Sequence, residues 1–263
     1  MNIVPFYPLR VLPSEDYFNG DLIYTFGDKP STEKVKYFHS PLQLYKSLPK
    51  DLPVHCHGMT KEMIMLYILM FNDKRHKTLT PHTSFGKYPP WGFPVNLFPI
   101  LFLLMKRFDK IRAISPYEFD YYQKKGLKQT YYEPLYVDKE YFALLGEHRM
   151  RRGVLCMGGN RAIKNVKTII NACSIAKEKL TIIDDVFPGS IEFNCAFMEN
   201  DIFVNSSYME GFPLGVAEAE ASGMKLCLSN LPTLKSIYGE RALYHEPDDY
   251  EKLAENINYC SGV

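Results

Sequence analysis

The sequence carries almost no net charge, and this absence limits the partners it can have. Its 263 residues include 31 Lys and Arg against 30 Asp and Glu, which leaves a net charge of +1. Proteins that bind nucleic acids usually show a basic excess or a basic stripe, so we expect no nucleic-acid partner. With 46% hydrophobic residues, the chain has enough apolar material for two modest domains.

Paired cysteines are also missing. The chain has six cysteines, and no two of them form a Cys-x-x-Cys motif. They are Cys56, Cys156, Cys173, Cys195, Cys227 and Cys260. This scatter excludes a small disulfide framework and favours reduced, mostly buried thiols.

The sequence offers no long uninterrupted apolar segment of the kind that spans a membrane. The run 93–105 reads FPVNLFPILFLLM and ends at Lys106-Arg107. A spanning helix needs about 20 residues, and Pro94 and Pro99 interrupt this run. Two interpretations stay open: a buried helix after a Pro-rich loop, or a surface helix that docks on lipid with its basic pair facing the headgroups.

The first residues, 1–5, contain no basic segment followed by an apolar core, so we expect no secretory signal. The expected localisation is therefore cytoplasmic, with membrane association as the open alternative.

The sequence alternates short apolar runs with helical patterns, as an α/β protein with doubly wound sheets does. A polar stretch, 146–153, is the expected linker between two such sets. The expected domains are therefore 1–148 and 149–263. The expected strands are 3–7, 22–26, 35–38, 54–57, 78–81, 111–114, 130–133, 154–157, 180–184, 201–205 and 225–229. The expected helices are 41–48, 60–72, 95–108, 116–125, 166–177, 191–199, 214–222 and 250–259.

Two carboxylates, Glu210 and Glu218, flank the most informative turn of the chain. An apolar strand runs into a polar turn, then into a bend with Gly211, and then into a helix. Free N–H groups and the positive end of a helix dipole favour a phosphate at such a turn. Carboxylates around it can accept hydrogen bonds from sugar hydroxyls. The local chemistry therefore predicts a site for a phosphate joined to a sugar.

Glu210 and Glu218 also allow less specific interpretations. One is a capping acid followed by a solvated helix residue. Another is the acid and nucleophile of a glycosidase. Eight helical residues would separate the pair by roughly 12 Å, whereas retaining glycosidases need about 5–5.5 Å. The spacing favours contacts with two parts of one long ligand.

A second loop, 157–166, also follows an expected strand and precedes an expected helix. Gly158 and Gly159 allow close approach of the backbone to a ligand. Arg161 and Lys164 supply positive charge for a diphosphate. The alternative for Arg161 is a solvated loop cation.

Histidines stand at the ends of two expected strands. His82 follows the strand 78–81, and ligands of open α/β sheets bind outside the carboxyl ends of the strands. His55 and His57 share one face of their strand by alternation. A metal would need a third ligand, and none is visible nearby in the sequence, so we expect no metal.

The loop 84–92 follows His82 and holds the single tryptophan, Trp91. Aromatic faces can stack on sugar rings, so this loop is a candidate wall for an acceptor. The alternative is an aromatic loop packed on its own domain.

Several of these segments resemble family 4 of the glycosyltransferases, enzymes of GT-B fold that use nucleotide sugars. The segment 210–219 reads EGFPLGVAEA and resembles the E-x7-E motif of the family. Lys164-Asn165 resembles the end of its G-R-x4-K-N segment. Gly159 stands where that segment has arginine, and Arg161 lies two residues later. The segments 231–238 and 242–247 resemble the family's next helix and last strand. His82 is similar to the histidine of a T-x-H segment, and His57 to the second histidine of an H-x-H-G segment.

The resemblance implies two Rossmann-like domains that face each other across a cleft. It implies that Glu210 lies by the donor sugar, that Glu218 bonds the ribose hydroxyls, and that Lys164 and Arg161 hold the phosphates. It places His82 near the donor phosphate and the acceptor hydroxyl, so His82 and Glu210 are the expected catalytic residues. The expected donor-binding residues are Gly159, Arg161, Lys164, Gly211, Phe212, Leu214 and Glu218, and the expected acceptor-side residues are His57 and Trp91.

The expected function is transfer of a sugar from a nucleotide-diphosphate sugar, UDP- or GDP-linked, to the hydroxyl of a glycan, lipid or small molecule. The resemblance implies a retaining enzyme without a cofactor. The chain lacks the Asp-x-Asp triplet that metal-dependent GT-A transferases usually need, which favours a metal-independent reaction. Two alternatives stay open, a non-catalytic nucleotide-sugar or glycan-binding protein and a nucleotide-sugar epimerase of the same fold.

Overall fold

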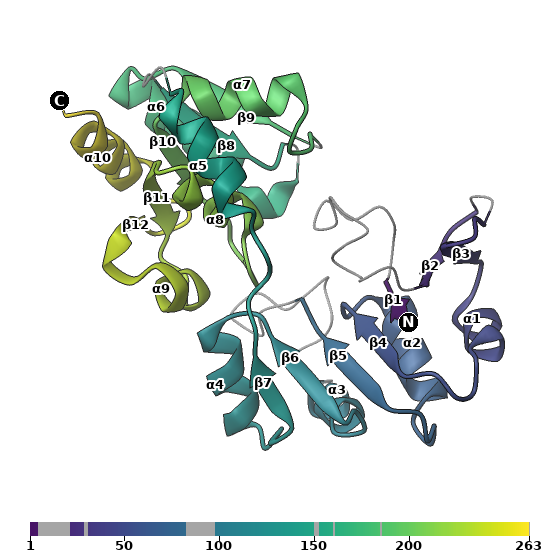
Figure 1. The fold of residues 1–263 in the computed structure, drawn as a ribbon. Helices are drawn as coiled ribbons and strands as arrows, with labels where there is room; N and C mark the ends of the chain where they lie inside the picture. Colours follow the sequence, from purple (N-terminus) through teal and green to yellow (C-terminus); the bar gives the residue numbers. More distant parts are fainter. Residues whose placement is uncertain are drawn as a thin grey trace. The chain divides into compact units, whose positions relative to one another are not determined.

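The computed structural model describes residues 1–4, 22–28, 31–82, 98–149, 153–159, 161–184 and 186–262. The chain divides into two compact units, Met1–Pro134 and Leu135–Val263. Each unit is built on its own parallel sheet with helical connections (Figure 1). The expected α/β class is confirmed.

The first unit contains a seven-stranded sheet of order β3-β2-β1-β4-β5-β6-β7, in which every paired strand is parallel. Its strands are β1 Asn2–Ile3, β2 Ile23–Phe26, β3 Val35–Phe38, β4 Val54–His57, β5 Lys77–Thr80, β6 Lys110–Ala113 and β7 Thr130–Tyr132. Its helices are α1 Pro41–Ser47, α2 Lys61–Leu69, α3 Phe98–Met105 and α4 Pro116–Lys124. From β1 the chain continues to β2 and β3 on one side, and it then returns to add β4 to β7 on the other side. The neighbours β1 and β4 therefore form the topological switch point of this sheet.

The apolar run at 93–105 supplies α3, and its first five residues lie outside the described part of the chain. Leu101, Leu104 and Met105 are buried in the core of the first unit. Ile100 and Leu103 point away from that core and are 53% and 52% exposed. Within the described residues, no helix is both long enough and apolar enough to cross a membrane. Contact with a lipid surface remains a proposal.

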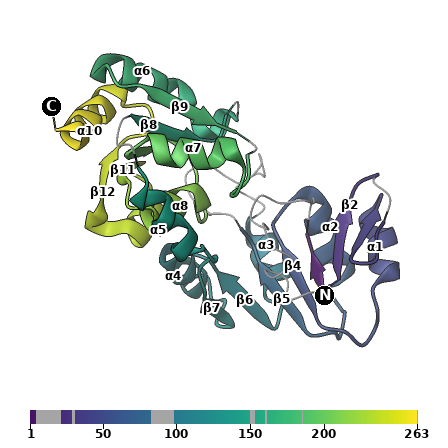
Figure 2. The ribbon, with the colours of Figure 1, turned by 45° about the horizontal axis from the view of Figure 1, so that its top comes forward.

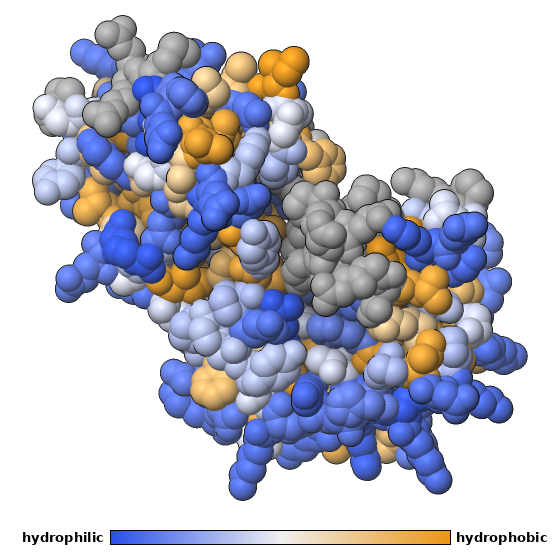
Figure 3. All heavy atoms as spheres, in the orientation of Figure 1, coloured by the Kyte–Doolittle hydropathy of each residue, from blue (hydrophilic) through white to orange (hydrophobic). Residues whose placement is uncertain are grey.

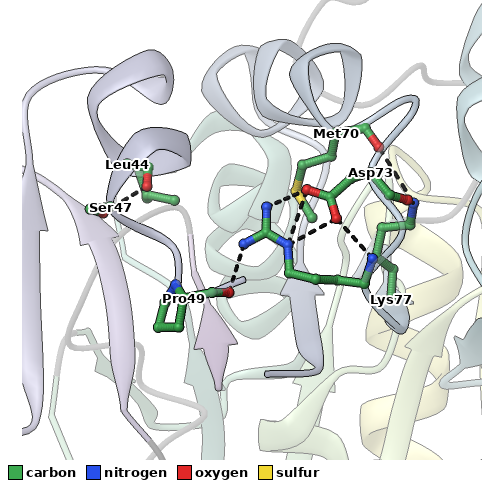
Figure 4. A network of polar contacts seen from close by, with 7 residues as sticks. Leu44, Ser47, Pro49, Met70, Asp73 and Lys77 are labelled. Carbon is green, nitrogen blue, oxygen red and sulfur yellow. Dashed lines mark hydrogen bonds and ion pairs between the residues drawn. The ribbon is translucent and has the colours of Figure 1, made fainter. Parts of the chain in front are cut away.

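A buried polar network closes the amino edge of this sheet (Figure 4). Asp73 Oδ1 accepts hydrogen bonds from the backbone N–H and from Nε of Arg75, both at 2.9 Å. Lys77 Nζ donates to the carbonyl oxygens of Asp73 at 2.6 Å and Met70 at 3.4 Å. Met70 caps the carboxyl end of α2, so the buried ammonium of Lys77 satisfies carbonyls at the negative end of that helix. The network joins α2 to β5 and lies opposite the carboxyl edge, where His82 lies.

Helix α4 begins with a capping arrangement that the sequence Ser115-Pro116 predicts. Ser115 Oγ accepts from the backbone N–H of Glu118 at 3.2 Å, and Glu118 Oε2 accepts from the backbone N–H of Ile114 at 3.0 Å. Glu118 is only 1% exposed. Burial raises the pKa of Glu118 to about 8, although the hydrogen bonds from the backbone of Ile114 and Ser115 lower it.

We expect Glu118 to make folding stability fall as the pH rises. Because its folded-state pKa lies above the ordinary 4.5, its stabilising effect is complete below that value and is lost as the pH rises through about 8. Glu118→Gln is uncharged at every pH and should remove this decline. Urea unfolding of both proteins between about pH 5 and about pH 8 tests it. An identical slope in the two proteins would show that Glu118 does not titrate in this way.

The second unit contains a five-stranded parallel sheet of order β12-β11-β10-β8-β9. Its strands are β8 Val154–Met157, β9 Leu180–Ile183, β10 Ile202–Asn205, β11 Lys225–Ser229 and β12 Ala242–His245. Its helices are α5 Lys139–Glu147, α6 Val166–Ala176, α7 Ile191–Glu199, α8 Leu214–Ala221, α9 Pro232–Tyr238 and α10 Tyr250–Ser261, with the short 3-10 turns η4 Ala162–Lys164 and η5 Gly239–Arg241.

Alternation along β8 gives the second unit two cores, one on each face of its sheet. Val154 and Cys156 face α6 and α10, which lie side by side in Figure 2. Leu155 and Met157 face the opposite layer, which contains α5, α7, α8 and α9. Both faces are covered, as a parallel sheet requires.

Helix α5 is the main element that the sequence interpretation missed. The sequence placed a linker at 146–153, but Phe142 and Leu145 of α5 are buried in the core of the second unit, where Phe142 packs against Phe193 and Phe197. Gly146 lies so close to the backbone carbonyl of Ser222 that no side chain would fit there. For this reason the second compact unit begins at Leu135, upstream of the expected boundary after residue 148.

Most expected elements match the structure within a few residues. The strands at 35–38, 54–57, 154–157 and 225–229 have the expected bounds. All six cysteines are free and five are buried, as expected. Figure 3 shows hydrophilic side chains over most of the visible face of each unit, with small and separate apolar areas.

Candidate functional site

The candidate site in the second unit lies at the switch point of its sheet. Strand β8 pairs with β9 on one side and β10 on the other. After β8 the chain passes through α6 to β9, and after β10 it passes through α8 to β11 in the opposite direction. The two loops that leave β8 and β10 therefore diverge, and ligands of such sheets bind where they part.

The loop after β8 brings Lys164 to this point. Gly158 and Gly159 have φ angles of +135° and +46°, which favour glycine. A Cβ on Gly158 would lie 2.7 Å from Cγ of Lys164, so the glycine makes room for the stem of that lysine. A Cβ on Gly159 would collide with the carboxylate of Asp184. The glycines are thus needed for the path of the loop around Lys164.

The loop after β10 brings Glu210 to the same point. Glu210 Oε1 accepts hydrogen bonds from Lys164 Nζ at 2.6 Å, Ser207 Oγ at 2.6 Å and Asn205 Nδ2 at 3.0 Å. The side chains of Lys164 and Glu210 are 18% and 9% exposed. Residues 46 positions apart in the sequence therefore form a largely buried ion pair.

The electrostatics of Glu210 keep it ionised. Burial alone would raise the pKa of Glu210, but the charge of Lys164 and the hydrogen bonds from Lys164, Ser207 and Asn205 outweigh burial and hold the pKa below its usual range. This pair stabilises the fold above the ordinary carboxyl pKa, and the stabilisation is lost as the pH falls through the lowered value. At neutral pH the carboxylate only accepts hydrogen bonds.

The two oxygens of Glu210 differ in their use. Oε1 takes all three hydrogen bonds given above, whereas Oε2 has none among the residues that the structure describes. Lys164 has three N–H donors, of which one is directed at Glu210. The pair therefore keeps both a free acceptor and free donors for a ligand.

Helix α8 starts four residues after Glu210. Its cap, Pro213, makes no side-chain hydrogen bond, and the first N–H groups of a helix have no intrahelical partner. Gly215 allows the helix to approach the sheet, because a Cβ there would lie 2.9 Å from Sδ of Met157. Glu218 lies on α8 and is buried. The helix start thus follows Glu210 directly in the chain, as the sequence predicted.

Arg161 takes a different position from Lys164. Its side chain is exposed, and its Nε donates to the carbonyl oxygen of Gly158 at 3.4 Å. It therefore folds back over the loop that carries Lys164. Its role in holding phosphates stays a prediction.

Sequence reasoning missed the contacts of three residues that hold this site together. Asn205 and Ser207 bind Glu210, and their signal was a run of polar residues directly after a buried strand. Asn165 has a left-handed backbone with φ +49°, and its Nδ2 donates to the carbonyl of Pro247 at 2.6 Å. That bond ties the loop after β8 to the segment before α10, which the sequence could not show.

The first unit gathers histidines at the carboxyl ends of β4 and β5. His57 is buried, and its Nδ1 lies 3.0 Å from Nε2 of His82. His55 stacks on His57 with ring centroids 4.1 Å apart, which confirms that they share a face. In the described part of the chain, no three His, Cys, Asp or Glu side chains form a group that could hold a metal ion. Trp91, the other expected acceptor-side residue, lies outside the described residues.

Comparison with solved structures identifies the fold, while comparison of sequences finds nothing. No protein-family model and no curated protein matches the chain. Sucrose-phosphate synthase from Thermosynechococcus elongatus matches with a TM-score of 0.72 at 13% identity, covering 98% of this chain and 88% of that chain. HepE of Anabaena in complex with UDP matches with a TM-score of 0.71 at 14% identity over 98% and 88%.

A third match is trehalose-6-phosphate synthase, an enzyme of glycosyl transfer with retention, with a TM-score of 0.70 at 9% identity over 98% of this chain and 90% of that chain. The chain has the GT-B fold. Identities this low concern the fold, so membership of family 4 itself stays a prediction.

Proposed function

We propose that this chain is a glycosyltransferase that moves a sugar from a nucleotide-diphosphate sugar to an acceptor hydroxyl. The observation that carries the proposal is the Lys164–Glu210 pair at the switch point of the second sheet, directly before the start of α8. These groups can recognise a sugar diphosphate: a cation and the beginning of a helix favour the phosphates, and an ionised carboxylate accepts hydrogen bonds from sugar hydroxyls. The GT-B neighbours support the proposed reaction class, since two of them are synthases of sugar phosphates and one was solved with UDP.

In the proposed reaction, Lys164 stabilises the charge that develops on the leaving diphosphate. Its ammonium keeps donors free beyond the one that Glu210 accepts. The N–H groups of Gly211, Phe212 and Leu214 add further donors, whereas Pro213 cannot donate. Charge stabilisation by groups already in place is the main catalytic contribution that we expect.

Glu210 and Glu218 take the sugar and the ribose in this proposal. Oε1 of Glu210 is held by Lys164 and two further donors, so Oε2 is oriented to accept from a sugar hydroxyl. Glu218 lies further along α8, where it would accept from the ribose hydroxyls. His82 of the first unit would contact the acceptor side.

The reaction is further proposed to be retaining and independent of a metal ion. Lys164 and the start of α8 supply positive charge that a divalent cation would otherwise provide. Turnover that survives excess EDTA supports this part, and a requirement for added Mg²⁺ or Mn²⁺ contradicts it. The anomeric configuration of the product, read by NMR, tests retention.

A screen of UDP-, GDP- and ADP-sugars tests the proposed function. A donor that binds raises the apparent melting temperature by mass action, and slow release of the nucleoside diphosphate then reports turnover. Tight binding without release favours a non-catalytic binding protein. Conversion of the donor to an isomer without any acceptor favours an epimerase. If no sugar nucleotide shifts the melting temperature or is turned over, the proposal fails.

Glu218→Gln is expected to weaken nucleotide binding by about 1–3 kcal/mol, because a neutral amide replaces the acceptor for the ribose hydroxyls. Titration calorimetry with the nucleoside diphosphate measures this loss. Glu220→Gln is the matched control, since Glu220 is on the same helix but pairs with Arg241. Equal affinities of the wild type and Glu218→Gln would remove Glu218 from the site.

A further inference from the structure

Three polar side chains form a chain of hydrogen bonds at the switch point of the first sheet. Asn2 comes from β1, His57 from the end of β4, and His82 follows β5 (Figure 1). His57 Nε2 lies 3.3 Å from Asn2 Oδ1, and His57 Nδ1 lies 3.0 Å from His82 Nε2. Both ring nitrogens of the middle histidine are thus engaged, one with each neighbour.

The chemistry of the end member sets the direction of these bonds. Asn2 Oδ1 can only accept, so His57 Nε2 must carry a proton. Burial, followed by the charges of His55, His82 and Arg112, lowers the pKa of His57 well below its usual range, so the ring is neutral. A neutral ring has one N–H, which leaves a lone pair on Nδ1 of His57. His82 Nε2 must therefore donate to it.

The same reasoning extends to the last ring. Burial, followed by the charges of His55 and Arg112, lowers the pKa of His82 to about 3, so this ring is also neutral. With its proton on Nε2, its Nδ1 keeps a lone pair. Nδ1 of His82 has no hydrogen-bond partner among the described residues. His82 is partly exposed, whereas His57 is 2% exposed, so a ligand meets His82 and not His57.

The backbone of His82 shows that this arrangement is imposed by its surroundings. Its φ is +53°, in the left-handed region that non-glycine residues seldom adopt. Strained backbone of this kind persists where surrounding contacts hold it, and it concentrates at functional sites. The bond to His57 is one contact that holds the ring in this position.

We propose that His57 is a positioning residue which, itself held by Asn2, fixes the ring of His82 with its proton on Nε2 and its lone pair on Nδ1. His82 then accepts a hydrogen bond from a hydroxyl of the ligand. An ionised phosphate oxygen has no proton to donate, so the fully ionised phosphates of a diphosphate are not the partner of Nδ1. The identity of that ligand as a sugar acceptor rests on the proposed function, whereas the order of protons does not.

NMR of the wild-type protein with ¹⁵N-labelled histidine tests the proton order directly. The chain has seven histidines, so the ring signals can be assigned with a His82→Gln variant. We expect an exchange-protected ring proton that is covalently bound to Nε2 of His82 and shows a small coupling to Nδ1 of His57, in addition to the buried proton on Nε2 of His57. A proton bound to Nδ1 of His57 instead, or no coupling between the two rings, would overturn the proposal.

Two variants of His57 separate positioning from a general packing role. His57→Asn places an amide oxygen near the former Nδ1, so the protected proton on His82 should remain. His57→Leu fills the space without an acceptor, so that proton should exchange with water and disappear. If His57→Leu folds and keeps the protected proton, His57 does not position His82. Should His57→Leu fail to fold, the wild-type spectrum and the His57→Asn variant still show whether His57 positions the proton on His82.

Kinetics with a donor and acceptor identified by the screen provide a second readout. His57→Leu should lower kcat by about 10²-fold, as misplaced catalytic groups do, with little change in the KM for the donor. His57→Asn should regain most of that loss. A protein without any transferase activity but with the expected proton on His82 would refute the proposed function and leave the proton order intact. An active enzyme without that proton would refute the proton order and leave the proposed function intact.

Discussion

Lys164→Met is expected to lower kcat for glycosyl transfer by about 10²–10³-fold, the loss typical of removing one group that stabilises developing negative charge. Methionine keeps the apolar stem that packs against Gly158 but removes the ammonium that binds Glu210 at 2.6 Å. Donor hydrolysis and transfer assays measure the change. Lys164→Arg retains the charge and should lose less activity.

The same substitution is expected to destabilise the fold, because it leaves the carboxylate of Glu210 largely buried without its cation. Breaking a buried pair costs about 3–5 kcal/mol of folding stability. Because the Lys164 side chain is 18% exposed and partly solvated, we expect a loss at or below the lower end of that range. Adding Glu210→Gln removes the unpaired charge. The double variant should therefore regain stability in urea unfolding while its activity stays low.

The double variant also decides between two roles for Lys164. If it recovers both stability and turnover, the Lys164–Glu210 pair serves the fold and not the reaction. If stability returns and turnover does not, the ammonium acts on the substrate.

Gly158→Ala is expected to have the second largest effect. At φ +135° a Cβ is strained, which costs about 1–3 kcal/mol. This Cβ would also lie 2.7 Å from Cγ and 3.1 Å from Cδ of Lys164, so the lysine must move away from Glu210. We expect kcat to fall by about 10²-fold, since catalytic groups tolerate little displacement. Unfolding free energies and transfer assays measure both effects.

Gly223→Ala provides the matched control for Gly158→Ala. Gly223 also has a positive φ, +75°, but a Cβ there meets nothing within 4 Å. The stability loss of Gly223→Ala therefore measures the backbone strain of a side chain at positive φ in the same unit, without a displacement of Lys164. If both substitutions cost the same stability and leave turnover unchanged, the loop after β8 does not position Lys164.

Sequence reasoning reached most of the fold because its signals were local. Strands such as 154–157 and 225–229 are apolar runs between polar turns, and they have the expected bounds. Ser115-Pro116 marks the start of α4 through its capping side chain and its fixed φ. Helix α5 escaped because its signal is weak: its buried face consists of Phe142 and Leu145. The rings that Phe142 packs against, Phe193 and Phe197, come from α7, far along the chain.

The sequence also selected the right loops of the second unit but not their contacts. Glu210 and Lys164 stood out because each follows a strand and precedes a helix near glycine. Their mutual ion pair was not foreseen, because it depends on β8 and β10 being neighbours in the sheet. The bonds from Asn205 and Ser207 to Glu210 are local, since the residues lie five and three positions from it, but the sequence does not show that both side chains meet one oxygen.

The order of residues along the chain thus determined the α/β class, the position of most helices and strands, and the turns where polar groups collect. These features depend on propensities and spacings within about ten residues. Only the tertiary structure decided which strand lies beside which, and therefore that Lys164 meets Glu210 and that His57 lies between Asn2 and His82. Contacts across 46 and 55 positions are set by strand order, which short stretches of sequence do not encode.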